Sequence, residues 1–135
     1  MPQYRCLVKQ GCLSGAVKTE LAQAITRIHC ELTGAPRHFV HVIFQEHPAG
    51  DWFTAGQQSS FSIVNASIRS GRTDGQKLSL MEQISREWSR ITGLPEIEIV
   101  VTVTDIASEH WMEAGHLMPQ AGEEKEWFAR LGLKA

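Results

Sequence analysis

The sequence contains one segment twice: ITRIHCELTGAP at residues 25–36 and ISREWSRITGLP at residues 84–95, 59 positions apart. Apolar residues beyond the first copy match apolar residues beyond the second, with Val40 and Val42 falling on Ile99 and Val101. Self-similarity at a fixed offset indicates a repeated structural unit. We therefore interpret the chain as two halves with the same plan, at about residues 2–46 and 61–104.

The first half has the pattern strand, helix, strand. Residues 4–8 form a short β-prone run, and Ser14 is a candidate helix N-cap. Apolar residues then recur at helical spacing, at Val17, Leu21, Ile25, Ile28 and Leu32. Gly34 suits a helix C-cap and Pro36 blocks further helix, so residues 38–46 are predicted to form the next strand.

The second half repeats this order. Residues 61–68 are predicted to form a strand, and Thr73 with Asp74 can cap the helix that follows. The apolar stripe of this helix is expected at Leu78, Met81, Ile84, Trp88 and Ile91. Residues 97–103 then form a nearly continuous apolar run, which is typical of a strand buried on both faces.

Two successive β-α-β units predict an α/β (α+β) fold. Each helix would connect two parallel strands by a right-handed crossover, which gives a four-stranded sheet with two helices on one face. The other face would lack a cover, and this favours a homo-oligomer. The length fits a single domain over residues 1–135. Residues 105–135 are expected to form a tail outside the repeat, with aromatic and apolar residues that cap the sheet or a neighbouring subunit: Trp111, Met112, Trp127, Phe128 and Leu131.

Charge and composition make several classes of function unfavourable. The chain has 13 Lys and Arg against 15 Asp and Glu, so no basic excess is present to neutralise nucleic acid. Its apolar runs are too short for a membrane span, and its first residues lack the apolar core of a signal peptide. Three cysteines without paired spacing favour reduced thiols, and we expect a cytoplasmic protein without nucleic-acid or membrane partners.

Pro2 follows the initiator methionine. A small second residue permits removal of Met1, and the chain would then begin with a secondary amine. Such an amine can act as a general base, a general acid or a nucleophile. Many proteins have proline at this position without using it, but here Pro2 directly precedes a predicted core strand that would hold it in place.

Four further residues are candidates for a site. Arg69 and Arg72 follow the third predicted strand and can bind a carboxylate by charge-assisted hydrogen bonds, with a solvated loop as the alternative. His29 lies beside the apolar stripe of the first helix, where a structural histidine is the commoner case. Glu113 lies among apolar residues and is a candidate acid–base group, with an exposed turn as the alternative.

No sequence pattern supports a metal or a nucleotide cofactor. His38 and His41 are three residues apart on a predicted strand and would point to opposite faces. The sequence has no HExxH, paired CxxC, GxGxxG or Walker A motif. We therefore expect a protein that works without a metal or cofactor.

Several short segments carry a further indication, in this order along the chain: residues 2–4, 24–26, His29, 32–34, 44–50, 69–72, 112–115, 119–122 and 126–128. Together they resemble the tautomerase superfamily and, within it, the cis-3-chloroacrylic acid dehalogenase group. The resemblance implies a homotrimer with active sites around the processed amino-terminal prolines. It implies a catalytic role for Pro2, and carboxylate binding by Arg69 and Arg72. It also implies that His29 holds and polarises the same end of the substrate, and that Glu113 activates water.

One position departs from the group. The dehalogenases pair the glutamate with a tyrosine near the end of the last repeat strand, where this sequence has Thr102. A threonine hydroxyl is shorter and less acidic, which argues against efficient hydration but not against proton transfer. We expect an isomerase, a keto–enol tautomerase acting on small 2-oxo or enol carboxylic acids. The alternatives are a hydratase or dehalogenase of 3-haloacrylic or acetylenic acids, and a non-catalytic oligomeric binding module.

Overall fold

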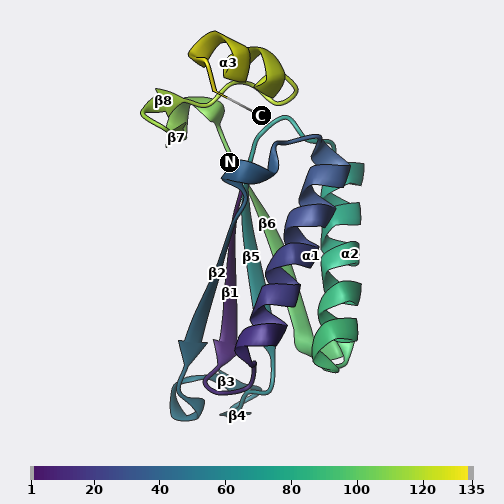
Figure 1. Ribbon diagram of the computed structural model, residues 1–135. Helices are drawn as coiled ribbons and strands as arrows, with labels where there is room; N and C mark the ends of the chain where they lie inside the picture. Colours follow the sequence, from purple (N-terminus) through teal and green to yellow (C-terminus); the bar gives the residue numbers. More distant parts are fainter. Residues whose placement is uncertain (1, 134–135) are drawn as a thin grey trace.

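A computed structural model describes residues 2–133 and shows one four-stranded sheet with two helices on one face (Figure 1). The strands are β1 (Gln3–Lys9), β2 (His41–His47), β5 (Ser62–Arg69) and β6 (Ile99–Ile106), in the order β2-β1-β5-β6. Helices α1 (Gly15–Thr33) and α2 (Asp74–Thr92) each connect a parallel pair, and β1 and β5 join the halves in antiparallel fashion. The predicted fold class is confirmed.

Local sequence signals fix both ends of the two long helices. The Ser14 hydroxyl accepts a hydrogen bond from the Val17 amide at 3.2 Å at the start of α1. Thr73 and Gln76 form a reciprocal capping box at the start of α2. Gly34 and Gly93 end the helices with φ of +71° and +77°, a left-handed conformation that glycine adopts without steric cost. The helix ends therefore lie where the sequence predicts them.

Three details of the predicted elements are wrong. Strand β2 begins at His41 and not at residue 38, because residues Arg37–Phe39 form a 3-10 turn. Leu78 is 54% exposed, and the buried stripe of α2 instead runs through Leu80, Ile84 and Trp88 at spacings of four residues. The fourth strand begins at Ile99, because residues Glu96–Glu98 form a 3-10 turn that leaves Ile97 84% exposed. Side chains of β6 then alternate between the core and the open face, so this strand is not buried on both faces within one chain.

The repeat extends further than the sequence comparison indicated. Short hairpins β3–β4 (Phe53–Thr54 and Gln57–Gln58) and β7–β8 (Met112–Glu113 and His116–Leu117) are also 59 residues apart. Their turns share a left-handed alanine, Ala55 at φ +54° and Ala114 at φ +53°. The tail outside the repeat therefore begins after residue 117 and not at residue 105. The sequence carries this extension as well, because Trp52, Ala55 and Gly56 are identical to Trp111, Ala114 and Gly115 at the same offset.

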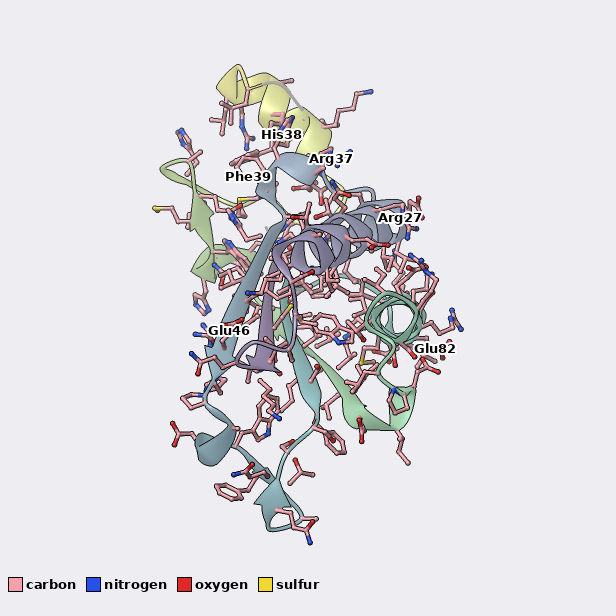
Figure 2. All side chains as sticks on the ribbon, turned by 60° about the horizontal axis from the view of Figure 1, so that its bottom comes forward. Arg27, Arg37, His38, Phe39, Glu46 and Glu82 are labelled. Atoms are coloured by element: carbon pink, nitrogen blue, oxygen red, sulfur yellow. The ribbon has the colours of Figure 1, made fainter. Side chains whose placement is uncertain are left out.

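The carboxyl-terminal segment forms a second, smaller core at the end of the sheet where β1 begins (Figure 1). Helix α3 (Glu124–Leu131) carries Trp127 and Phe128 into it, and the Trp127 indole donates to the Leu117 carbonyl at 3.0 Å. Phe39 packs against both aromatic rings from below α3 (Figure 2). The aromatic residues of the tail thus cap the sheet end, although Met112 is 63% exposed.

The second face of the sheet is not covered by α1 or α2, which share the first face with the main core. Ile43 and Val100 on this open face are 45% and 38% exposed. Thr102 also lies here and donates to Asn65 Oδ1 at 2.7 Å. Within residues 2–133, no helix combines the length and the apolar character needed to cross a membrane.

Candidate active site

The candidate residues come together at one end of the sheet. Strand β1 starts there and pairs with β5 in antiparallel fashion, with Gln3 opposite Ser67. Arg69 follows Ser67 by two residues and therefore lies near Pro2, which precedes Gln3. Pro2 is buried, and its carbonyl accepts a hydrogen bond from the His41 amide at 3.0 Å. The carboxyl end of α1 and the loop before α2 meet at the same place.

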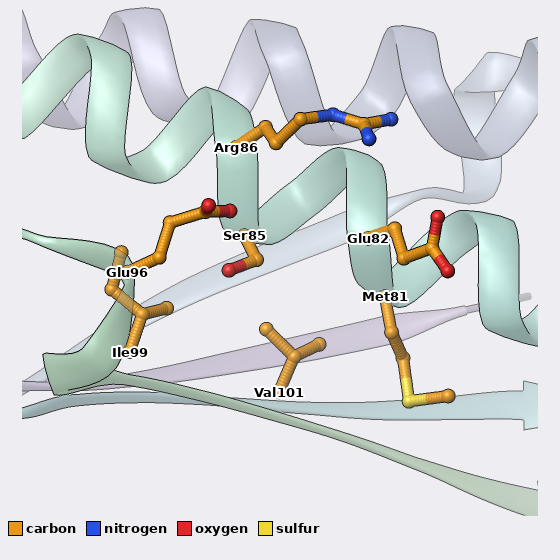
Figure 3. A pocket seen from close by; sticks show the side chains of 7 residues that line it. All are labelled: Met81, Glu82, Ser85, Arg86, Glu96, Ile99 and Val101. Atoms are coloured by element: carbon orange, nitrogen blue, oxygen red, sulfur yellow. The ribbon is translucent and has the colours of Figure 1, made fainter.

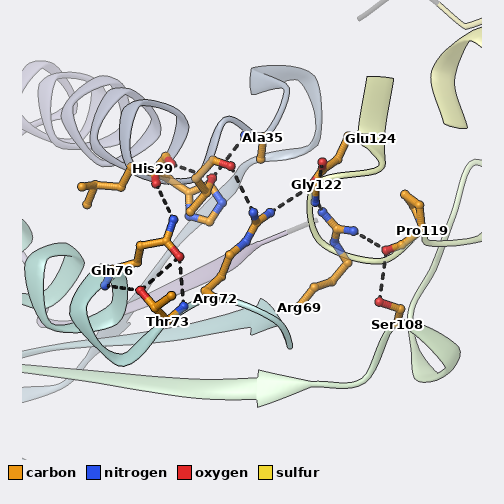
Figure 4. Close-up of polar contacts among 12 residues, drawn as sticks. His29, Ala35, Arg69, Arg72, Thr73, Gln76, Ser108, Pro119, Gly122 and Glu124 are labelled. Atoms are coloured by element: carbon orange, nitrogen blue, oxygen red, sulfur yellow. Dashed lines mark hydrogen bonds and ion pairs between the residues drawn. The ribbon is translucent and has the colours of Figure 1, made fainter. Parts of the chain in front are cut away.

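The two arginines form a buried pair (Figure 4). The side chains of Arg69 and Arg72 are 1% and 8% exposed, so the alternative of a solvated loop is excluded. Arg69 donates to the Pro119 carbonyl, and Arg72 donates to the Thr33 carbonyl at 3.0 Å. These contacts connect β5, the carboxyl end of α1 and the segment before α3.

Glu124 provides the counter-charge for this pair. Its Oε1 accepts from Nη2 of Arg69 at 2.5 Å and from Nη2 of Arg72 at 2.8 Å, while Oε2 accepts from the Gly122 amide at 2.9 Å. Burial alone would raise the pKa of Glu124, but backbone hydrogen bonding and the arginines outweigh it and lower the pKa below its usual value. Glu124 is therefore ionised at neutral pH.

Sequence reasoning missed Glu124, although a signal was present. Two buried arginines require a compensating carboxylate, because the cost of removing both cations from water is high. Residues 119–122 and 126–128 carry the family resemblance, and Glu124 lies between them. The pairing itself joins residues more than 50 positions apart and cannot be read from local pattern.

His29 is a neutral, oriented side chain. It is 2% exposed, and burial together with the nearby Arg72 and Arg69 lowers its pKa to about 3. The Tyr4 hydroxyl lies 2.7 Å from His29 Nδ1, and burial raises the pKa of Tyr4 far above its ordinary value. Tyr4 therefore keeps its proton, and its hydroxyl shares one hydrogen bond with Nδ1, in which the donor depends on the tautomer of His29.

The neutral state of His29 predicts a pH dependence of stability. Its pKa of about 3 in the folded protein lies below the unfolded value of about 6.5. Between these values the unfolded chain binds one more proton, so stability falls as the pH is lowered, by about 1.4 kcal/mol per pH unit from this group. His29→Gln should flatten the pH dependence of the free energy of unfolding, measured by urea denaturation. An unchanged slope in the folded variant would contradict this assignment.

Glu113 lies at the same end of the sheet, in β7. Its side chain is 13% exposed, its Oε1 lies 3.3 Å from His41 Nε2, and its charge acts on Arg69. Thr102, in contrast, lies on the open face of the sheet, where it pairs with Asn65. Arg69 pairs with Ile106, so Thr102 lies four residues away from Arg69 along β6. Within one chain, the structure therefore brings Glu113 to the site but not Thr102.

Two hollows differ in their relation to these residues. A cavity of about 540 Å³ borders Glu124 and is lined by Thr33, Gly34, Pro36, Gly122, Glu124 and Lys125. Another, of about 370 Å³, lies between α2 and β6 and includes Glu82, Arg86 and Ile99 (Figure 3). Ile99 pairs with Ser62 at the far end of β5 from Arg69, so the second hollow is remote from Pro2.

Fold and site together define a tautomerase-type protein, and comparison with known proteins agrees. The profile of a family described as "Putative oxalocrotonate tautomerase enzyme" matches residues 1–130, so the chain belongs to this tautomerase family. None of the curated proteins compared with the chain matches it.

Solved structures place the chain more narrowly. The crystal structure of N1, a member of the cis-3-chloroacrylic acid dehalogenase family, is 36% identical, with a TM-score of 0.91 over 94% of this chain and 90% of that one. Native Ps01740 is 37% identical, with a TM-score of 0.81 over 82% and 99%. A fused 4-OT wild-type symmetric trimer is 28% identical, with a TM-score of 0.80 over 88% and 97%. The resemblance to the cis-3-chloroacrylic acid dehalogenase group is thereby confirmed.

Proposed function

We propose that this protein is a cofactor-free keto–enol tautomerase acting on small 2-oxo or enol carboxylic acids, with Pro2 as the proton-transferring group. The observation that carries the proposal is the buried pair Arg69 and Arg72 beside the start of β1. This pair already holds one carboxylate, that of Glu124. Arg72 has five N–H donors, and its described bonds to Thr33 and Glu124 use two of them.

The remaining groups fit a proton transfer between carbon and oxygen. After loss of Met1, a neutral Pro2 nitrogen would remove a proton from C3 of a 2-oxo acid. The electron pair of that C–H bond becomes the C3–C2 double bond. The protonated Pro2 nitrogen then returns its proton to the carbonyl oxygen, which gives the enol and restores the neutral amine. Neutral His29 would orient the substrate by a hydrogen bond from its ring and would not add a positive charge to the site.

Self-association is part of the proposal. The open face of the sheet exposes apolar side chains such as Ile43 and Val100, and burying them against a second copy would remove this surface from water. The similar fused 4-OT structure is a symmetric trimer. We propose a homotrimer in which the open faces meet.

Ketonisation of phenylenolpyruvate, followed by absorbance without added metal or cofactor, tests the proposed activity. We expect turnover by protein whose intact mass shows that Met1 is absent. The same preparation should be tested for halide release from cis-3-chloroacrylate, because Glu113 at the site is the residue that a hydratase or dehalogenase would use. Halide release without ketonisation would favour that alternative, and a retained Met1 with neither activity would favour a binding module.

A further inference from the structure

Neither the sequence nor the proposed reaction gives a role to Glu124, which contacts both arginines of the site. Its carboxylate is 7% exposed and contacts both arginines through one oxygen. The other oxygen is held by the Gly122 amide at 2.9 Å. The same helix buries Trp127 and Phe128 in the second core. Glu124 is therefore held both at its carboxylate and through its helix, and it forms a fixed part of the site.

The segment before Glu124 is also tightly packed. Gly71 lies between the two arginines in a left-handed conformation, with φ of +109°. A Cβ atom built on it would lie 2.9 Å from the Ala121 Cβ, closer than such atoms approach in proteins. Residues 119–122 thus pack directly on the arginine loop at Gly71, which holds the segment before Glu124 against the arginine pair.

We propose that Glu124 determines the charge of the substrate, restricting the anion site to acids with a single carboxylate; this inference rests on the proposed function. The charges of the buried group are the cations Arg69 and Arg72 and the anions Glu124 and Glu113, the last of which acts on Arg69. Lys125 lines the cavity beside Glu124, but it is exposed to solvent and is not part of this buried group. His29 is neutral. Two cations are thus balanced by two anions before any substrate binds.

A monocarboxylate adds one negative charge to this balanced group, and its oxygens gain hydrogen bonds from guanidinium donors. A dicarboxylate adds two, and the second charge finds no free cation among these groups. Because the side chains are buried, this repulsion is weakly screened by solvent. Without the charge of Glu124 the same site would carry one net positive charge and would tolerate the second carboxylate better. Glu124 acts here as a specificity-determining, positioning residue.

A matched pair of ligands tests the inference. 2-Oxopentanoate and 2-oxoglutarate have the same five-carbon chain and differ by one carboxylate. We expect calorimetric titration to give a lower Kd for 2-oxopentanoate with the wild-type protein. In the near-isosteric Glu124→Gln variant, the ratio of the two Kd values should shift toward 2-oxoglutarate by about tenfold or more. Glu126→Gln, which removes an exposed charge from the same helix, should leave the ratio unchanged.

The ratio separates a role in specificity from a purely structural one. A general loosening of the site would raise the Kd values of both ligands by the same factor. Equal increases of this kind in a folded Glu124→Gln variant would overturn the inference. Glu124→Asp keeps the charge and should keep the wild-type preference even if both affinities fall. Wild-type preference for 2-oxoglutarate, or binding of neither ligand, would overturn the inference without any variant. Exchange of the C3 protons of 2-oxopentanoate for deuterium in D2O tests the proposed tautomerase activity separately. If the Kd values follow the expected pattern but no exchange occurs, the tautomerase activity is rejected and the role of Glu124 in ligand selection is retained.

Discussion

Replacement of Pro2 by alanine is expected to reduce kcat for phenylenolpyruvate ketonisation by about 10²- to 10⁴-fold, the usual contribution of a positioned acid–base group. Alanine is also small enough to permit removal of Met1, so the variant still has an amino terminus. That terminus is a primary amine without the pyrrolidine ring, which fixes the backbone of Pro2 at the start of β1. The loss would therefore report the pyrrolidine amine together with its fixed position at the start of β1.

The controls for this experiment are close at hand. Gln3 is the next residue and is exposed, so Gln3→Ala should retain activity. The Pro2 carbonyl, which accepts from the His41 amide, is unchanged in Pro2→Ala, and circular dichroism should show a wild-type fold. Intact mass should confirm that Met1 is absent from both variants. Full activity in Pro2→Ala would reject the proposed mechanism.

Replacement of Trp127 by alanine should have the largest effect on structure. Trp127 is 3% exposed and packs against Phe39 and Phe128, and loss of a buried tryptophan costs about 3–5 kcal/mol. Helix α3 has eight residues and is too short to be stable without its packing. Since Glu124 is its first residue, release of α3 would also withdraw the carboxylate from the arginine pair.

Hydrogen exchange measures where this loss occurs. In Trp127→Ala we expect amides of residues 124–131 to lose protection, whereas amides of β1 and β5 keep most of theirs, because the main core has no residue from α3. Trp127→Phe keeps an aromatic ring and loses the indole hydrogen bond to Leu117, so its effect should be smaller. Equal loss of protection across the whole sheet would show that the two cores are not independent.

Those parts of the structure that depend on neighbouring residues were predictable from the sequence. Caps at Ser14, Thr73, Gly34 and Gly93 act over three or four residues, and the β-α-β order follows from periodicity. The stripe of α2 was misplaced at Leu78 because spacings of three and four residues fit the pattern almost equally well. Ile97 was counted as strand because its composition does not distinguish a 3-10 turn from an extended start.

The residues of the candidate site could be proposed from the sequence, but the contacts between them could not. Pro2, Arg69, Arg72, His29 and Glu113 were selected from position and resemblance, and the structure brings them to one end of the sheet. The hydrogen bond between Tyr4 and His29 and the ion pairs of Glu124 were not predicted. Both depend on the order of the strands and on the docking of α3, and these arise from contacts between distant parts of the chain.

The 59-residue offset also shows that each half lacks the candidate site residues of the other half at the equivalent positions. The counterpart of Pro2 is Phe61, whose nitrogen is a peptide amide that donates to Ser59 Oγ at 3.1 Å. Arg69 and Arg72 correspond to Gln10 and Leu13, and His29 corresponds to Trp88, which lies in the main core. The duplicated scaffold thus carries the candidate site once, with residues from both halves. In the proposed trimer, each polypeptide would offer one ionisable imino nitrogen, which gives three and not six.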